Sequence, residues 1–207
     1  MTTPGIEVRP IRTIDGGHEV NEIFFTDVKV PAENLVGEEN KGWTYAKYLL
    51  THERTNIAGV GKSNQELERL KALARSQKRG GKPLAEDPLF AARLARVEID
   101  LMNMETTNLR VLAEAEAGGA PGPESSMLKI LGTEIEQELT DLTRRALGRS
   151  ATALTPEVDE PGYNGPYVTP EGFQHSTEVY FNHRKTTIYG GSNEIQKNII
   201  AKHVLGL

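Results

Sequence analysis

The sequence predicts a mainly α-helical protein, an antiparallel four-helix bundle preceded by a few β-strands. Apolar residues recur at helical spacing from residue 42 onward, and glycine- and proline-rich stops separate the long helical segments. The first part of the chain is instead rich in β-branched and aromatic residues between turn signals. We therefore divide the chain into residues 1–37, the end of a β domain, and residues 38–207, the bundle.

Two extended stretches with a turn between them are predicted in residues 1–37. Residues 6–11 carry apolar side chains at extended spacing, residues 15–17 are the turn signal Asp-Gly-Gly, and residues 22–30 are rich in β-branched and aromatic side chains up to Pro31. So few strands cannot bury an apolar face by themselves. We expect this segment to be the end of a β domain whose beginning the chain lacks.

A single long helix is predicted from Gly42 to near Arg79, where glycines and a proline follow. A continuous apolar stripe is typical of a helix that packs in a bundle. The residues of this stripe are Trp43, Ala46, Leu50, Ile57, Val60, Leu67, Leu70 and Leu73 with Ala74.

Two further long helices are predicted on either side of a glycine- and proline-rich loop at residues 118–123. The first begins at Asp87, an N-cap residue followed by proline. Its apolar residues are spaced by four and three, as in a bundle: Phe90, Leu94, Val97, Leu101 and Met104. The apolar face of the next helix consists of Leu128, Leu131, Ile135, Leu139, Leu142 and Ala146.

The C-terminal quarter begins with a long irregular segment and ends in a helix. Residues 148–174 hold four of the eleven prolines, and long loops of this kind are often functional. Helical signals resume at residues 176–184. A last helix is predicted from Ser192, with Ser192 or Asn193 as its cap. These helices together predict the four-helix bundle.

The bulk composition excludes several classes of function. The chain has 207 residues, 37% of them hydrophobic, and a net charge of -5, which does not attract nucleic acid or anionic lipid. It has no cysteine and no apolar run long enough for a transmembrane helix. The spacing of His175, His183 and His203 does not fit a metal site. We expect a cytoplasmic protein with no nucleic-acid partner, no membrane insertion and no metal.

Residues 188–202, of sequence IYGGSNEIQKNIIAK, resemble the closing signature of the acyl-CoA dehydrogenase family. Residues 4–11, residues 24–37 and Gly42-Trp43 are similar to the end of that family's middle β domain and the start of its last domain. The order and spacing of these matches extend over nearly the whole chain. Residues 52–55, of sequence HERT, make the chain most similar to the large subunit of pimeloyl-CoA dehydrogenase and related bacterial enzymes.

The resemblance implies an FAD-dependent enzyme that converts an acyl-CoA thioester into the 2-enoyl-CoA. Members of the family have an N-terminal helical domain, a middle β domain and a C-terminal four-helix bundle. The chain is therefore expected to be a fragment, or a gene product that needs a partner. The family also implies an electron-transfer flavoprotein as acceptor, and a dimer or tetramer, or a hetero-oligomer with a second acyl-CoA dehydrogenase subunit.

The resemblance points to Glu53 as the catalytic base. Many family members have a glutamate directly after the tyrosine of the closing signature, but Gly190 follows Tyr189 here and cannot accept a proton. A second family position for the base lies directly before an arginine on the first bundle helix, and Glu53-Arg54 matches it. The alternative is that Glu53 is a solvated carboxylate paired with a neighbour such as Arg54 or Lys47.

The resemblance also implies which residues contact the ligands. Arg54, Tyr189 and Gly190 are expected at the substrate. Glycines permit close approach of the backbone, and free N–H groups at a helix start favour anionic or carbonyl oxygens. The residues expected at the FAD are Gly191, Ser192, Glu194, Arg79 and Arg145. The alternative for Ser192 and Glu194 is an ordinary helix cap.

Two departures from the family pattern weaken the expected FAD site. The family's arginine and Phe-Gly after the first bundle helix align with Gln77 and Gly80-Gly81, so Arg79 is a substitute. The family's glutamine- and glycine-rich element aligns with residues 145–150, where Arg145 or Arg149 could reach a pyrophosphate. Each arginine has the alternative of a surface or interface charge. Tyr163, Tyr167 and Phe173 of the long loop are expected at an acyl pocket or at a subunit contact.

Three functions remain open from the sequence. The first is an acyl-CoA dehydrogenase or its C-terminal portion. The second is a non-catalytic partner subunit, an oligomerisation bundle that completes an FAD site on another chain, and the glycine at position 190 favours it. The third is an unrelated helical interaction module, which explains the bundle but not the motifs at the two ends.

Overall fold

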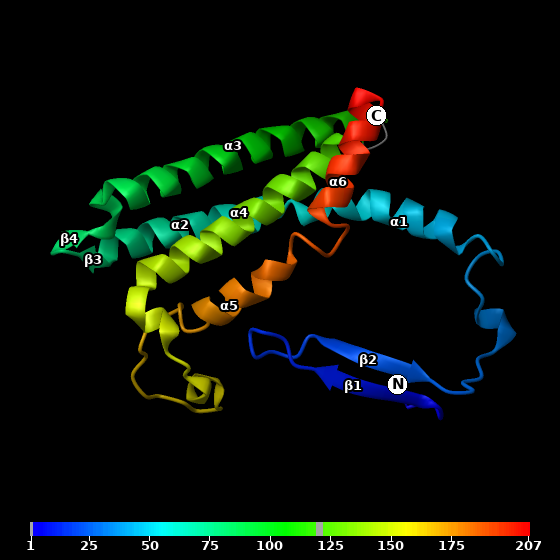
Figure 1. Cartoon of the computed structure of the whole chain (residues 1–207), viewed down its shortest axis with the longest axis horizontal. Helices are drawn as coiled ribbons and strands as arrows, with labels where there is room; N and C mark the ends of the chain where they lie inside the picture. The colour runs from blue at the N-terminus through cyan, green and yellow to red at the C-terminus, as the bar shows by residue number, and fades with distance from the viewer. Residues whose placement is uncertain (1, 119–121) are drawn as a thin grey trace.

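The computed structural model describes residues 2–118 and 122–207, without the side chains of residues 50–57, and confirms the predicted helical fold class (Figure 1). The helices are α1 (Gly42–Ile57), α2 (Val60–Ser76), α3 (Pro88–Glu116), α4 (Glu124–Leu147), α5 (Ser176–Asn182) and α6 (Asn193–Ile200). The strands are β1 (Ile6–Ile11), β2 (Val20–Phe25), β3 (Lys78–Arg79) and β4 (Lys82–Pro83). Short helical turns are η1 (Ala32–Asn34), η2 (Leu84–Glu86), η3 (Gly148–Thr152), η4 (Pro156–Asp159), η5 (His183–Lys185) and η6 (Ala201–Leu205).

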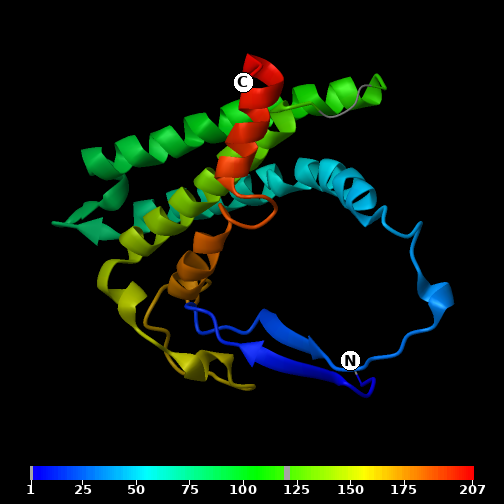
Figure 2. The same cartoon turned by 45° about the vertical axis from the view of Figure 1, so that its right-hand side comes forward.

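The core lies between α2, α3 and α4, and α3 runs antiparallel to both α2 and α4 (Figures 1 and 2). Asp87 caps α3 as predicted, because its carboxylate accepts from the N–H groups of Leu89 and Phe90, both at 3.0 Å. The predicted apolar stripes of α3 and α4 are buried, with Leu94 and Leu131 partly so. α4 also contacts α1, α5 and α6, so it is the central helix of the domain.

The prediction of one continuous helix from Gly42 to near Arg79 is wrong. Gly59 has a left-handed backbone (φ 57°), which ends α1 and starts α2. α1 then leaves the bundle, and Trp43, predicted in the core stripe, has 70% of its surface exposed. The sequence signal was Gly59 with Gly61 two residues later, and a helix often tolerates isolated glycines, so the break is not evident without the tertiary structure.

Strands β1 and β2 form an antiparallel hairpin that pairs Ile6 with Phe25 and Ile11 with Val20. The second strand was predicted over residues 22–30 and instead ends at Phe25, because Asp27 has φ 50°. The hairpin meets the bundle through polar contacts of its turn with α5 and η5. The contact residues are Asp15 and Glu19 on the hairpin, and Asn182 and Lys185 on the bundle.

Asp141 links three arginines near the C-terminal end of α4. Its carboxylate accepts from Arg145 at 2.6 Å, from Arg93 at 2.9 Å and from Arg144 at 2.9 Å. Burial raises the pKa of Asp141, but the hydrogen bonds from Arg145, Arg93 and Arg144 outweigh it and lower the pKa to about 2. The Arg93 contact joins α3 to α4.

Replacing Asp141 with asparagine is expected to destabilise the fold by about 2 kcal/mol at pH 6, because a lowered carboxyl pKa is free energy of folding. The pKa of the Asp141 carboxyl is lower in the folded protein than in the unfolded protein. The stabilisation is therefore complete above about pH 4 and disappears as the pH falls toward about 2. Urea unfolding of the wild type and of the Asp141→Asn variant at pH 6 and pH 2 measures this difference in the free energy of unfolding. Asp100→Asn, which breaks the exposed pair with Arg96, is the control and should cost about 0.5 kcal/mol or less. An equal Asp141→Asn effect at both pH values would contradict this assignment.

Candidate functional site

The closing segment runs from η5 through a turn at residues 186–192 into α6. Ser192 caps α6 as predicted, and its hydroxyl accepts from the N–H of Ile195 at 3.4 Å. Asn193, the other predicted cap residue, is instead buried against α4. Its N–H donates to the carbonyl of Thr187 at 3.0 Å, which closes the turn on itself.

Two left-handed glycines shape this turn, which we call the glycine turn (residues 190–192). Gly190 has φ 67° and Gly191 has φ 83°. The fully buried Gln196 donates through Nε2 to the carbonyls of Gly190 at 3.4 Å and Gly191 at 3.3 Å. A Cβ on Gly191 would lie 2.5 Å from that Nε2 atom, so a larger residue would have to displace the Gln196 side chain.

The carbonyls of the glycine turn point inward, and this fixes where its N–H groups point. In a trans peptide the C=O and the following N–H point in opposite directions, and the described residues contain no cis bond. The N–H groups of Gly191 and Ser192 therefore face away from Gln196. No hydrogen bond within the described part of the chain satisfies the N–H of Gly190, Gly191 or Ser192. Unpaired N–H groups at a helix start can receive an anionic or carbonyl oxygen.

Glu194 stands beside these N–H groups in the first turn of α6. The pKa of its carboxyl is lowered, because its own backbone N–H and the Ser192 hydroxyl donate to it. The carboxylate is exposed. A charged, exposed carboxylate suits a ligand that donates hydroxyl hydrogens, such as a ribose.

An open cleft of about 590 Å³ is lined by Ile188 and Tyr189, which directly precede the glycine turn. Its walls come from the hairpin turn, from η5 and from Lys62 and Glu136 of α2 and α4. Burial and the charge of Glu136 raise the pKa of the Tyr189 hydroxyl, so this hydroxyl stays neutral and can donate.

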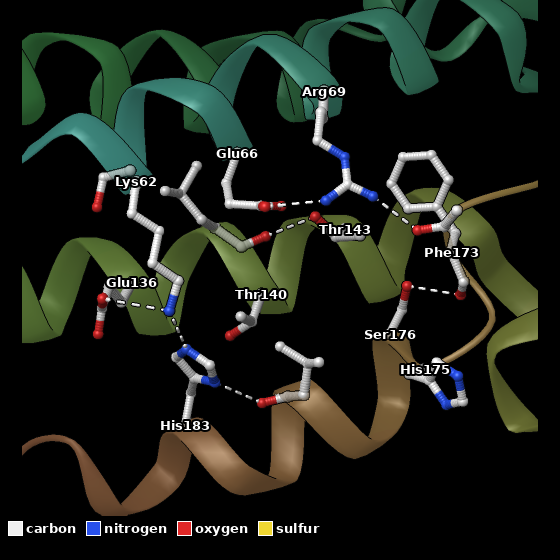
Figure 3. Close-up of a pocket in the computed structure, with 14 residues that line it drawn as sticks. Lys62, Glu66, Arg69, Glu136, Thr140, Thr143, Phe173, His175, Ser176 and His183 are labelled. Atoms are coloured by element: carbon white, nitrogen blue, oxygen red, sulfur yellow. Dashed lines mark hydrogen bonds and ion pairs between the residues drawn. The ribbon is translucent and has the colours of Figure 1, made fainter. Parts of the chain in front are cut away.

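A second cavity of about 270 Å³ lies between α2, α4 and α5 (Figure 3). Lys62 reaches across it to Glu136 at 3.9 Å and to Nε2 of His183 at 3.5 Å. Nδ1 of His183 donates to the Val179 carbonyl at 2.8 Å, so the neutral ring has its lone pair on Nε2, toward Lys62. Lys62, Glu136 and His183 also line the open cleft and form the wall between the two spaces.

The far end of this cavity is formed by the long irregular loop. Arg69 donates to the Gly172 carbonyl at 2.6 Å and lies over the ring of Phe173 (Figure 3). Of the three loop aromatics predicted at a pocket or a subunit contact, Phe173 lines this cavity. Tyr163 and Tyr167 stack on each other in the loop, away from the residues that line it.

The side chains of Glu53 and Arg54 lie outside the described residues, so their predicted roles stay predictions. Their backbone belongs to the end of α1. Ala58, five residues after Glu53, packs so closely on Gly132 of α4 that a Cβ there would lie 2.8 Å from the Ala58 carbonyl oxygen. Lys129 and Thr133, on the same stretch of α4, contact Asn193. The end of α1 and the start of α6 therefore converge on one segment of α4.

Arg79 and Arg145 lie away from the glycine turn. Arg79 is on β3, at the end of the bundle opposite α6, and Arg145 is in the last turn of α4 (Figures 1 and 2). Arg79 pairs with Asp87 at 3.6 Å and Arg145 with Asp141 at 2.6 Å. The structure thus does not bring either arginine to Gly191, Ser192 and Glu194 within one chain.

The sequence interpretation missed two buried polar residues behind the glycine turn, Lys129 and Gln196. A signal for Lys129 was present, since small residues surround it on α4 and allow neighbouring helices to approach: Ser125, Ser126, Gly132 and Thr133. In the part of the chain that the structure describes, no three His, Asp or Glu residues are placed to hold a metal. No helix in the same part is long and apolar enough to cross a membrane.

Fold and site together define a helical-bundle domain with a glycine turn suited to a ligand oxygen. The chain belongs to the acyl-CoA dehydrogenase family, because residues 40–205 match the model of that family's C-terminal domain. It is 35% identical to the acyl-CoA dehydrogenase IpdE1 of Mycobacterium tuberculosis over 211 aligned positions, which cover all of this chain and 49% of that protein. The chain thus spans about half the length of the curated relatives it matches.

Solved structures of the family have the same fold. The ChsE4–ChsE5 complex from Mycobacterium tuberculosis matches with a TM-score of 0.77 and 28% identity over all of this chain and 51% of that one. An acyl-CoA dehydrogenase from Geobacillus kaustophilus matches with a TM-score of 0.79 and 27% identity over all of this chain and 50% of that one.

Gly191→Ala is expected to destabilise the protein by about 2–3 kcal/mol, because it adds left-handed strain and forces Gln196 out of its buried position. Gly81 is the matched control, since it has the same φ of 83° and open space where a Cβ would stand, and Gly81→Ala should cost only about 1 kcal/mol. Chemical denaturation compares the two variants. Equal losses of stability in the two variants would show that the contact between Gln196 and Gly191 does not contribute to stability.

Proposed function

We propose that this protein takes part in the FAD-dependent α,β-dehydrogenation of an acyl-CoA thioester to the 2-enoyl-CoA. Membership of the family gives the reaction class. The observation on this chain that supports the proposal is the glycine turn. Its unpaired N–H groups, next to an exposed carboxylate, suit a ligand that has both phosphate oxygens and ribose hydroxyls.

The residues present fit FAD at this turn. Gly191 and Ser192 would offer N–H groups to phosphate oxygens, and Glu194 would accept from a ribose hydroxyl. The flavin, when bound, supplies the hydride acceptor of the reaction. The chain itself would bind and orient the cofactor, and a side chain at position 191 would have to displace Gln196 beneath the turn.

Glu53 is our proposed base for the proton next to the thioester carbonyl, and Arg54 its neighbour at the substrate. Gly190 has no side chain to accept a proton. The end of α1, which carries Glu53, converges with the start of α6 on the same segment of α4. A carboxylate brought into a closed site gains the raised pKa that a general base needs near neutral pH. The open cleft beside Tyr189 and Gly190 is the proposed place of the thioester.

A complete site requires parts beyond one copy of this chain. The hairpin β1–β2 has only two strands, and we propose that residues 1–37 belong to a β domain separate from the bundle at 38–207. Arg79 and Arg145, at the far end of the bundle, are proposed to reach the FAD of a neighbouring subunit. An electron-transfer flavoprotein is the proposed acceptor.

Glu53→Gln is expected to lower turnover by about 10²–10⁴-fold without changing the FAD content, because the amide cannot accept the proton. The measurement is acyl-CoA oxidation with an artificial acceptor, alongside the flavin absorbance, in protein assembled with its complete flavin-binding β structure. Glu68→Gln, at an exposed carboxylate paired with Lys71, is the control and should leave turnover unchanged.

Unchanged turnover in Glu53→Gln would exclude Glu53 as the base. Loss of both FAD and turnover would instead show that Glu53 has a structural role. We expect the 207-residue chain alone to bind FAD weakly and to have no dehydrogenase activity. Full flavin content in the isolated chain would contradict the proposed need for further β structure.

A partner subunit is the second candidate function, and exposed apolar residues on α3 favour it. They share one side of the helix at spacings of three and seven, as in a helix that packs on another: Ile99, Met102, Leu109 and Leu112. The related ChsE4 and ChsE5 form a complex. We propose that this chain likewise assembles, with a second copy or with another acyl-CoA dehydrogenase subunit.

Met102→Lys combined with Leu109→Lys is expected to abolish this assembly, because two charges would have to be buried in the contact. Analytical ultracentrifugation measures it, first on the chain alone and then with the candidate partner subunit. Leu154→Lys, at a still more exposed leucine outside α3, is the control. If the double variant assembles as the wild type does, α3 is not the contact.

A further inference from the structure

Lys129 is a fully buried lysine in the centre of the domain. It lies next to the buried Leu128 on α4, the helix that contacts α1, α2, α3, α5 and α6. Within the described residues its ammonium has one hydrogen-bond acceptor, the side-chain oxygen of Asn193 at 2.9 Å. Burial lowers the pKa of Lys129, and the nearby charge of Glu194 opposes this only in part.

A buried ammonium bonded to an amide is an unfavourable way to stabilise a core. Its desolvation costs several kcal/mol, and an amide oxygen offsets less of that cost than a carboxylate would. An unbranched apolar residue such as methionine would fill the same space without this cost. Lys129 therefore needs an explanation other than packing.

The contacts of Asn193 supply that explanation. Asn193 directly follows the glycine turn, and its side-chain oxygen also accepts from Thr133 at 3.4 Å. Its N–H donates to Thr187 at 3.0 Å, across the base of the turn. The start of α6 is thus attached to α4 by Lys129 and to the preceding turn by its own backbone.

Lys129 and Gln196 hold the turn from two sides. Gln196 fixes the carbonyls of Gly190 and Gly191, and Lys129 fixes the residue after Ser192. Glycines on their own are free to adopt many conformations, so an unattached glycine turn would lose its outward N–H groups for most of the time. Ligand binding would then have to supply the cost of ordering them.

We infer that Lys129 is a positioning residue, which through Asn193 holds the N–H groups of Gly191 and Ser192 ready for the diphosphate of a nucleotide cofactor. This inference rests on the proposed function. Lys129 does not touch the ligand and takes no part in proton transfer. FAD and coenzyme A both contain a diphosphate, so the proposed ligand class is a nucleotide cofactor that contains a diphosphate.

The test is a double-mutant cycle on the whole chain with inorganic pyrophosphate as the probe. Lys129→Met and Asn193→Leu, alone and together, are titrated and followed by the amide NMR shifts of Gly191 and Ser192. Each single variant is expected to bind about tenfold more weakly, and the double variant no more weakly than either, because the two side chains act through one contact. Lys197→Met, an exposed lysine on α6, is the control for general loss of positive charge and should change binding less than about threefold.

Thermal unfolding separates positioning from stability. Lys129→Met is expected to keep or raise the unfolding midpoint, since it removes a buried charge, while binding still falls. In the free Lys129→Met protein the amide resonances of residues 190–193 should shift, and those of α2 should not. Should Lys129→Met fold poorly, Lys129→Gln, which retains a donor, is used with the same readouts and is expected to recover part of the affinity.

The outcomes distinguish this inference from the proposed function. If the wild type binds no pyrophosphate, the turn is not a diphosphate site and the proposed function loses its main support. If the wild type binds and Lys129→Met binds equally well, or if the free amides of the turn are unchanged, the positioning role is wrong. If the wild type binds pyrophosphate, FAD and coenzyme A are titrated against it in competition. The one that displaces pyrophosphate identifies the source of the diphosphate.

Discussion

The close packing of α4 against its neighbours is the constraint on which the rest of the structure depends. Gly132 lets the α1–α2 junction come within contact of the α4 backbone, and any Cβ at that position would collide with Ala58. Lys129, three residues before Gly132, and Thr133, directly after it, both donate to the side-chain oxygen of Asn193 at the start of α6. The break in the first helix, the position of the closing turn and the end of α1 are therefore set by one short stretch of α4.

The sequence predicts the parts of the fold in which a local pattern and the tertiary packing agree. The stripe from Phe90 to Met104 is buried as its spacing indicates, and Asp87 caps α3. Gly59 has no such local pattern: its left-handed backbone occurs beside Ala58, which packs on Gly132 of α4, and the residues around it in the sequence do not indicate that contact. The exposure of Trp43 follows from that same break, since α1 turns away from the core.

The site was predictable only where residues act through the main chain. Glycines before a serine cap indicate an outward-facing N–H turn, and the structure has one at residues 190–192. Lys129 could not be found in this way, because a lysine in a helix is usually solvated and its burial depends on which helices cross there. The ion pairs of Arg79 with Asp87 at the start of α3, and of Arg145 with Asp141 on α4, likewise were not revealed by family position alone.

The separation of the proposed FAD contacts argues for a two-copy site. The glycine turn lies against the N-terminal half of α4 and Arg145 in its last turn, in a helix of 24 residues, which is about 36 Å long. One chain cannot bring both to one phosphate group without unwinding α4, whose buried face is the core of the domain. In the proposed assembly, a two-fold axis between two bundles would do so at no such cost, because each copy would then offer its glycine turn to one cofactor and its arginine end to the other.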